Sequence, residues 1–269
     1  MPEATPVDRG TPILQLDQVV RSFGGVRAVD GCSFSIDRGS LTALIGPNGA
    51  GKSTVVNLVA GALKPDAGSI VYGGVDITGV VSHRIAGRGL IRTFQLSREF
   101  ARMTVLENLV VVARGQSGES LFNALLRPRL CRREDRVLVE RAIDVLDRFG
   151  LAAQRDMYAG DLSGGQKRLV ELARAVMSEP ELLILDEPMA GVNPALIDLL
   201  GGHIESLCRN GITVVMVEHN LEIVERICDH VVVMALGRTL ATGVMSDLRS
   251  NSEVVRAYLG ERLDEPTVR

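Results

Sequence analysis

The sequence contains no tryptophan, and only 3% of its residues are aromatic. Proteins that bind single-stranded nucleic acid commonly stack bases on aromatic side chains, so this composition argues against such a platform. Basic residues are not in excess either, because 30 Lys and Arg residues stand against 33 Asp and Glu residues, which gives a net charge of −3. A nucleic-acid-binding domain usually shows a basic excess. We therefore expect no nucleic-acid partner.

Closely spaced cysteines are also missing. The four cysteines, Cys32, Cys131, Cys208 and Cys228, stand far apart and form no C-x-x-C pair. A disulfide framework or a zinc site would need closer spacing, so we interpret all four as reduced cytosolic thiols.

Long apolar runs are absent as well, since none approaches the ~20 residues needed to cross a bilayer. The N-terminal segment, MPEATPVDRGTP, has two acids and three prolines and lacks the apolar core of a signal peptide. We expect residues 1–12 to be a disordered tail and 261–269 to be a second tail. The protein is expected to be soluble, although it can lie on a membrane partner.

The remaining composition is that of an ordinary globular protein, with 46% apolar and 23% charged residues among 269. Near the N-terminus, ILQLDQVVRSF and GVRAVDGCSFSID alternate between apolar and polar residues and predict an antiparallel β region. Later, ELLILDEP and GITVVMVEH are apolar without alternation, which is typical of parallel strands covered on both faces. These patterns predict an α/β fold.

Helical patterns dominate from about Met103 to Gly150. Within this region one apolar stripe, expected to pack in the core, consists of Leu138, Ala142, Val145 and Phe149.

Two further elements are expected near the C-terminus. HVVVMALGRTLATG predicts a hairpin that turns near Leu236 and Gly237. In SNSEVVRAYLG, Ser250 and Glu253 have the spacing of a capping box, so we expect a last helix that ends near Gly260.

One glycine-rich stretch stands between an apolar strand and a helix expected at 53–60. It fits G-x-x-x-x-G-K-[ST] and consists of Gly46, Pro47, Asn48, Gly49, Ala50, Gly51, Lys52 and Ser53. Glycines let backbone N–H groups turn toward phosphate oxygens, and the helix adds its positive N-terminal end. Lys52 would reach the β- and γ-phosphates, and Ser53 would hold Mg²⁺. The alternative is a glycine-rich turn with a surface lysine, but the full match in this context predicts a site for a nucleoside triphosphate.

Two carboxylates end the apolar strand LLILDEP. Asp186 at the strand tip suits a contact to Mg²⁺, and Glu187 suits a base for the attacking water. The alternative is a strand end with two solvated acids. The N-K-x-D element that reads guanine in GTPases is missing, so ATP is favoured.

A second possible phosphate cradle occurs in LSGGQKRLVELARAV, where Ser163, Gly164, Gly165 and Gln166 begin a helix. Two cradles in one chain make sense if each ATP is held between two copies of the protein. A capped helix start without a ligand is the alternative.

With these motifs in this order, the chain resembles the nucleotide-binding subunit of ATP-binding cassette (ABC) transporters from about Ile13 to Gly260. The resemblance implies a P-loop NTPase fold with an antiparallel β subdomain, a RecA-like core and a helical subdomain. It implies one ATPase domain over 13–260, with the helical subdomain at about 97–178 inside it.

The resemblance also implies roles for single residues. Phe23 lies where an aromatic ring stacks on adenine, and Thr54 joins the phosphate-binding residues. Gln95 matches the glutamine that senses the γ-phosphate and contributes to the Mg²⁺ site with Ser53 and Asp186. His219 in MVEHN matches the switch histidine, which acts together with Glu187 and Gln95 in hydrolysis. Alone, Phe23 could be a core residue, Gln95 a loop residue and His219 a strand-end imidazole.

Three features are similar to one branch, the branched-chain amino acid importers. They are AGVNP, with Asn193 where many cassettes have aspartate, the insertion LFNALLRPRLCRREDR, and the ending VVRAYLGE. Urea, amide and lipopolysaccharide cassettes have related tails and stay possible. This likeness implies an ATPase that powers solute uptake at the cytoplasmic face of the membrane. Its partners would be permease subunits, a second cassette (the same or a sister chain) and, indirectly, a solute-binding protein.

Other functions remain as alternatives. An exporter or a lipid-extracting cassette would share every catalytic motif. A soluble cassette protein that acts on ribosomes or DNA usually has two cassettes or a long coiled-coil insertion, and this chain has neither. A small-molecule kinase would have no use for a second cradle.

Overall fold

The computed structural model describes residues 12–93, 100–113 and 128–259. The chain divides into two compact units. The first unit comprises Met1–Arg92, Glu181–Ala190 and Ile204–Arg269, and the second comprises Thr93–Pro180 and Gly191–His203. The expected limits of the ATPase domain and of its helical subdomain stay predictions.

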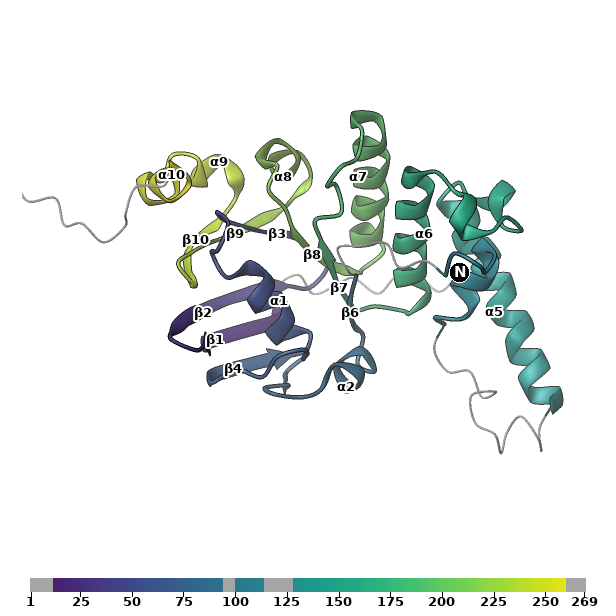
Figure 1. Ribbon diagram of the computed structural model, residues 1–269, viewed down its shortest axis with the longest axis horizontal. Coiled ribbons are helices and arrows are strands. Elements are labelled where there is room, and N and C mark those ends of the chain that lie inside the picture. Colours follow the sequence, from purple (N-terminus) through teal and green to yellow (C-terminus); the bar gives the residue numbers. More distant parts are fainter. Residues whose placement is uncertain (1–11, 94–99, 114–127, 260–269) are drawn as a thin grey trace, which may run out of the picture. The chain divides into compact units, whose positions relative to one another are not determined.

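The first unit contains two β-sheets (Figure 1). The smaller sheet is antiparallel, with the order β2-β1-β4-β5. Its strands are β1 (Pro12–Phe23), β2 (Val26–Asp37), β4 (Ala67–Tyr72) and β5 (Val75–Asp76).

The larger sheet has the order β10-β9-β3-β8-β7-β6, and its pairs are parallel except for the β9–β10 hairpin. Its strands are β3 (Leu41–Ile45), β6 (Leu90–Arg92), β7 (Leu182–Asp186), β8 (Thr213–Val217), β9 (His230–Ala235) and β10 (Arg238–Gly243). The predicted antiparallel opening, the parallel apolar strands and the hairpin turn near Leu236 and Gly237 are confirmed.

Helices accompany both sheets of the first unit. They are α1 (Lys52–Val59), α2 (Ser82–Ala86), α8 (Leu221–Ile227), α9 (Met245–Leu248) and α10 (Ser252–Leu259).

The central strands of the larger sheet are buried on both faces, because every residue of β3, β7 and β8 is buried. One face packs against α1 and the antiparallel sheet, in a cluster that contains Leu44, Ile184 and Val55. The opposite face packs against α8, α9 and α10, where Ala43 meets Val224. A sheet covered on both faces explains why these strands read as continuous apolar runs.

The last helix begins differently from the prediction. The side chain of Asn251 accepts hydrogen bonds from the N–H groups of Glu253 (2.9 Å) and Val254 (3.4 Å), so Asn251 caps α10. The predicted capping box of Ser250 with Glu253 is therefore wrong. The Ser250 hydroxyl instead donates to the carbonyl of Asp247 (3.0 Å), just after the short helix α9.

The second unit is helical in its described residues. Its elements are α3 (Val105–Val110), α5 (Pro128–Arg148), two 3₁₀ turns (Ala152–Gln154 and Ala159–Asp161), α6 (Gly164–Met177) and the first residues of α7 (Pro194–Arg209). Helices α3, α5 and α6 pack on one another. The predicted stripe on α5 and its end is confirmed at Ala142, Val145 and Phe149, which are buried.

The side chain of Asn108 is a polar group buried within the second unit. Asn108 is fully buried on α3. Its amide nitrogen donates to the carbonyls of Phe100 (3.1 Å) and Thr104 (2.9 Å), and its amide oxygen accepts from the N–H of Phe100 (2.9 Å). Asn108 thus supplies hydrogen bonds to the chain that enters α3.

The carboxyl group of Glu218, which directly follows β8, is buried in the first unit. Glu218 is 4% exposed, and its two oxygens accept from the N–H groups of Met189 (3.0 Å) and His219 (3.2 Å). Burial raises the pKa of Glu218 and the nearby Glu187 carboxylate raises it further, while the two N–H groups oppose the shift. Glu218 therefore links the loop after β7 to the end of β8.

In the part of the chain that the structure describes, no helix is both long and apolar enough to span a membrane.

Replacing Asn108 by alanine should lower the free energy of unfolding by about 2–3 kcal/mol, because the N–H and C=O groups of Phe100 and the carbonyl of Thr104 lose their partner. Urea unfolding followed by circular dichroism measures the change. Asn210→Ala is the control: this exposed asparagine donates only to the carbonyl of Ser206, so its loss should cost less than about 1 kcal/mol. Equal effects of the two substitutions would contradict this account of Asn108.

Glu218 predicts a pH dependence of stability. Because its pKa in the folded protein lies above the ordinary value of 4.5, its contribution to stability is greatest below that pH. This contribution is lost as the pH rises through the folded pKa. The unfolding free energy of the wild type, measured relative to Glu218→Gln, should therefore decrease as the pH is raised from about 4.5 to 8. The exposed Glu222→Gln gives the baseline, and a difference that grows with pH would refute the prediction.

Candidate active site

The glycine-rich loop joins β3 to α1, so the predicted strand–loop–helix context is confirmed; the helix begins at Lys52. Gly46 and Gly51 have φ values of 151° and 96°. A Cβ on Gly46 would lie 2.1 Å from the carbonyl oxygen of Met234, and a Cβ on Gly51 would lie 2.4 Å from that of Ala28. Only glycine fits such close approaches of backbone to backbone.

Lys52 crosses this loop. Its ammonium nitrogen donates to the carbonyls of Gly46 (2.7 Å) and Pro47 (3.0 Å), and the residue is only 6% exposed. Burial lowers the pKa of Lys52, while the nearby carboxylates of Glu187 and Asp186 raise it. The loop therefore holds a cation between its own backbone and two acids.

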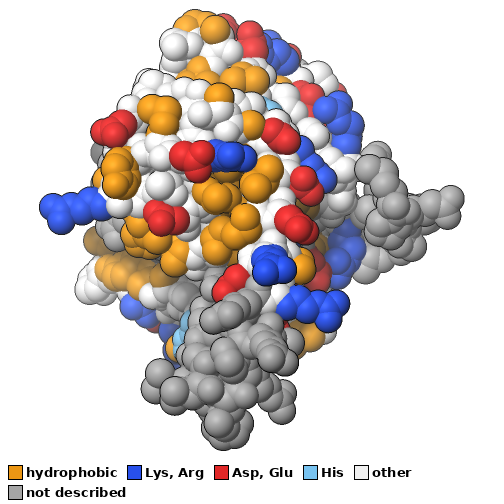
Figure 2. All heavy atoms as spheres, turned by 90° about the vertical axis from the view of Figure 1, so that its right-hand side faces the viewer, with side chains coloured by type: hydrophobic (Ala, Val, Ile, Leu, Met, Phe, Trp, Pro, Cys, Tyr) orange, Lys and Arg blue, Asp and Glu red, His pale blue; other side chains and the backbone are white. Residues whose placement is uncertain are grey.

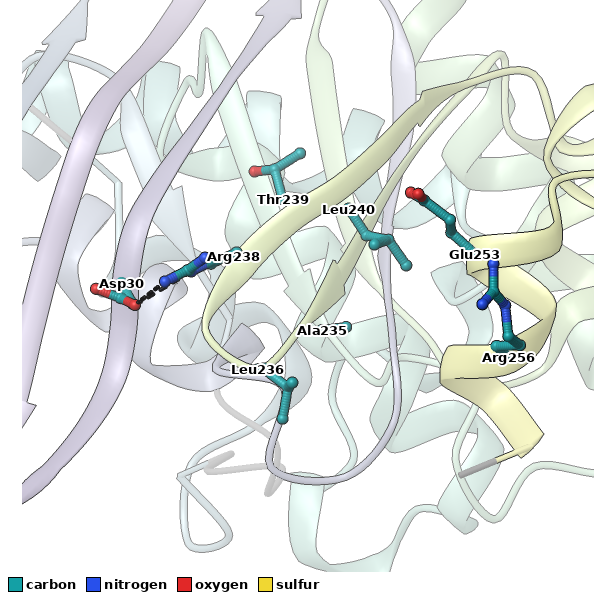
Figure 3. Close-up of a pocket in the computed structure, with 8 residues that line it drawn as sticks. All are labelled: Asp30, Ala235, Leu236, Arg238, Thr239, Leu240, Glu253 and Arg256. Carbon is teal, nitrogen blue, oxygen red and sulfur yellow. Dashed lines mark hydrogen bonds and ion pairs between the residues drawn. The ribbon is translucent and has the colours of Figure 1, made fainter. Parts of the chain in front are cut away.

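Two neighbouring segments support the loop from outside. The N–H of Gly237, in the β9–β10 turn, donates to the carbonyl of Ala50 (3.1 Å), and the N–H of Asp30 on β2 donates to that of Gly237 (2.9 Å). Arg238 then donates twice to the Asp30 carboxylate, at 2.6 and 3.1 Å (Figure 3). The guanidinium groups of Arg238 and Arg27 hold the pKa of Asp30 below its usual range. The β9–β10 turn is thus fixed to both β2 and the loop.

A cavity of about 590 Å³ lies beside this turn (Figure 3). It is lined by Asp30, Ala235, Leu236, Arg238, Thr239, Leu240, Glu253 and Arg256. The cavity was not predicted from the sequence, because its lining comes from β2, the β9–β10 hairpin and α10.

The two predicted carboxylates lie at the carboxyl end of β7. Asp186 is 7% exposed. Glu187 follows with φ of 50°, in the left-handed region that residues with a side chain rarely adopt, and its N–H donates to the carbonyl of Val217 (3.0 Å). This backbone turn brings the Glu187 carboxylate to 2.8 Å from Nε2 of His219. The structure therefore joins two residues predicted from separate motifs.

Two charged residues at this edge of the sheet were not predicted. Glu218 fixes the backbone of His219. Arg92, at the end of β6, donates to the carboxylate of Asp186 (2.8 Å) and to the side-chain oxygen of Asn57 on α1 (2.6 Å). A signal was available at Glu218, since a carboxyl group directly follows the apolar run of residues 214–217.

Of the other predicted residues in the first unit, Phe23 and Ser53 are exposed and Thr54 is half-buried. Phe23 ends β1 with 46% of its surface exposed, and the Arg21 guanidinium stands 5.0 Å from the centre of its ring. Ser53 and Thr54 lie in the first turn of α1, where Ser53 is exposed and Thr54 half-buried. Gln95 lies outside the described residues.

Ser163, Gly164, Gly165 and Gln166 belong to the second unit, at the start of α6. Ser163 accepts from the N–H of Gln166 (3.3 Å), and the Gln166 side chain accepts from the N–H of Ser163 (3.0 Å). Ser163 and Gly164 are exposed. This capping box leaves a helix start facing solvent.

Asn193 caps the start of α7, because its side-chain oxygen accepts from the N–H of Leu196 (3.0 Å). Many cassettes have aspartate where this chain has Asn193. Because asparagine keeps the side-chain oxygen that accepts the hydrogen bond, this substitution preserves the helix cap.

The residues of the first unit fit a nucleotide with a divalent cation. The loop presents its backbone and Lys52 to phosphates, and the buried carboxylate of Asp186 and the hydroxyl of Ser53 supply oxygen atoms of the kind Mg²⁺ prefers. Among the described residues, no group of three or more His, Cys, Asp or Glu side chains could hold a metal ion. A cation here would thus depend on the phosphates and on water for its other ligands.

The chain is similar to known proteins over most of its length. Residues 29–190 match the family model described as ABC transporter. The chain is 40% identical over 253 residues to the probable branched-chain amino acid transport ATP-binding protein LivG of Archaeoglobus fulgidus, covering 94% of this chain and 97% of that protein. It is 38% identical over 251 residues to the high-affinity branched-chain amino acid transport ATP-binding protein LivG of Escherichia coli, and the match covers 93% of this chain and 98% of that protein.

Solved structures give the same result. A crystal structure of the ADP conformation of an ATP-binding cassette of an ABC transporter is 39% identical, with a TM-score of 0.81 over 93% of this chain and 100% of that one. A nucleotide-free cassette is 38% identical, with a TM-score of 0.79 over 92% and 99% of the two chains. This chain therefore belongs to the ABC transporter family and is an ATP-binding cassette with the fold of its ATPases.

Proposed function

We propose that this chain hydrolyses ATP to power an importer of branched-chain amino acids. The proposal of ATP hydrolysis is supported by the contact between Oε1 of Glu187 and Nε2 of His219 (2.8 Å). Glu187 also lies near Lys52, whose ammonium group bonds to the glycine-rich loop. The substrate part is supported by the relatives, which are named as branched-chain amino acid transport proteins. Those names favour amino acids over the urea, amide and lipopolysaccharide alternatives.

The proposed chemistry assigns each group one task. Glu187 accepts a proton from a water molecule while the oxygen of that water attacks the γ-phosphorus of ATP. The bond between the γ-phosphorus and the β–γ bridging oxygen then breaks, which releases ADP and phosphate. Lys52 and the loop N–H groups neutralise the charge that spreads over the phosphate oxygens. His219 orients Glu187 and, with Gln95, contacts the γ-phosphate.

Mg²⁺ is assigned to Ser53, Asp186 and Gln95, and when bound it would neutralise phosphate charge. Phe23 is assigned to the adenine ring. Its exposed face, at the end of β1, supports that role because stacking needs an accessible ring.

A second cassette, of the same or a sister chain, is proposed to complete each site with the segment from Ser163 to Gln166. The exposed start of α6 supports this assignment, because helix N-termini present N–H groups and a positive dipole end to phosphate. In this scheme, the segment from Ser163 to Gln166 of one cassette contacts the ATP that is bound to the glycine-rich loop of the other cassette. It does not contact the ATP bound to its own chain.

Permease subunits are the proposed membrane partners, with a solute-binding protein acting through them at the other face. In the second unit, large apolar side chains are exposed at Phe100, Met157 and Tyr158. Figure 2 shows a face on which hydrophobic side chains gather among acidic and basic ones. Exposed apolar groups of this kind mark contact surfaces and support docking to a permease at the cytoplasmic side of the membrane.

Glu187→Gln should leave ATP bound but reduce its hydrolysis by about 100-fold or more, because the amide cannot accept the proton of water. A phosphate-release assay gives the rate, and size-exclusion chromatography with ATP should show a stable dimer. Glu222→Gln, an exposed change, should hydrolyse ATP normally. A normal rate in Glu187→Gln would show that another group is the base.

Cells that lack this chain should lose uptake of labelled leucine, isoleucine and valine at low concentration and keep uptake of labelled urea. The wild-type gene should restore amino acid uptake, and the Glu187→Gln gene should not, because transport needs hydrolysis. Loss of urea uptake with normal leucine uptake would refute the proposed substrate.

A further inference from the structure

Arg92 is the one described cation at this edge of the sheet that the proposed function does not use. It is the last residue of β6, which pairs with β7 in the larger sheet (Figure 1). Its guanidinium donates to Oδ2 of Asp186 at 2.8 Å and to Oδ1 of Asn57 at 2.6 Å. The side chains of Arg92 and Asp186 are 15% and 7% exposed. The ion pair is thus fixed by a second hydrogen bond and largely removed from water.

The partner of Arg92 is the residue assigned above to Mg²⁺. Water screens this pair weakly, because both side chains are largely buried. A guanidinium in contact with a carboxylate reduces the negative potential that a second cation meets there. Neighbouring charges of this kind change the affinity of a carboxylate for a cation by roughly tenfold or more. Arg92 therefore opposes binding of a free divalent cation at Asp186.

We propose that Arg92 is a positioning residue that acts as the resident counter-ion of Asp186. It neutralises the buried carboxylate while no nucleotide is present, and it weakens the carboxylate's hold on Mg²⁺. Mg²⁺ then enters this site together with the phosphates, which supply the negative charge that Arg92 offsets. This inference rests on the proposed role of Asp186.

A structural ion pair without this role would behave differently. Its loss would lower the stability of the protein and leave the coupling between Mg²⁺ and nucleotide unchanged. The two accounts are distinguished by a binding ratio rather than by activity: the Kd of ADP without Mg²⁺ divided by the Kd of ADP with saturating Mg²⁺. This ratio measures how strongly the metal and the nucleotide favour each other's binding.

Arg92→Gln should lower this ratio about tenfold, because the unpaired carboxylate then holds Mg²⁺ even without a nucleotide and the phosphates add less to the binding of the metal. Isothermal titration calorimetry with ADP in EDTA and in MgCl₂ gives both constants without any turnover. The nucleotide-free variant should also unfold at a lower temperature, since Asp186 is left buried without its cation. Arg92→Lys retains a cation and should keep the ratio within about twofold of the wild type, which tests the charge itself in a variant that preserves folding.

Two further variants complete the design. Asn57→Ala removes the hydrogen bond between Asn57 and Arg92 and leaves the ion pair with Asp186, so its ratio should match the wild type. Asp186→Asn removes the carboxylate and should lower the ratio.

An unchanged or raised ratio in Arg92→Gln, together with a lowered ratio in Asp186→Asn, overturns the counter-ion role alone. A normal ratio in Asp186→Asn overturns the assignment of Asp186 to Mg²⁺ and the counter-ion role with it.

Discussion

The glycine-rich loop between β3 and α1 is in close contact with β2, with β9 and with the β9–β10 turn. At Gly46 and Gly51 these contacts leave no room for a side chain. Gly46 lies against the backbone of β9, Gly51 lies against β2, and Gly237 in the β9–β10 turn donates to the loop at Ala50. The conformation of the loop is therefore imposed by the first unit as a whole. A loop held in this way is preorganised, so nucleotide binding loses less free energy to ordering the backbone.

The same edge of the sheet concentrates ionisable groups that are largely withdrawn from water. Lys52 bonds to carbonyls of its own loop, Asp186 to Arg92, and Glu218 to two backbone N–H groups. A buried charge without such partners would cost several kcal/mol. These pairings let one small region hold charges of both signs, which a site for a polyanion and a metal requires.

Much of this arrangement could be predicted from the sequence because its signals are local. The loop between β3 and α1 follows from one motif, and the apolar runs of β7 and β8 predict their burial. The contact of Glu187 with His219 could not be read from either motif, because it depends on the backbone turn at Glu187. Arg92 was missed for a similar reason, since its partners lie 35 and 94 residues away in the chain.

Other failures came from competition between neighbouring residues. Ser250 has the spacing of a capping residue, but Asn251 is one position closer to α10 and takes that role. Helix α9 was not predicted either, because its four residues are too few to show a helical period. Short elements of this kind are fixed by packing, as Met245 and Leu248 are in the cluster below α8 and α10.

The left-handed backbone of Glu187 has an evolutionary consequence. A residue with a side chain in this conformation costs about 1 kcal/mol relative to glycine, which adopts it freely. Selection for thermal robustness alone would thus favour glycine at this position, and only the need for a carboxylate opposes it. Three other described residues, Gln18, Glu179 and Leu236, share this backbone conformation. A search for more stable variants would favour glycine at all four positions, and at Glu187 the gain in stability would remove the carboxylate that is proposed to act in hydrolysis.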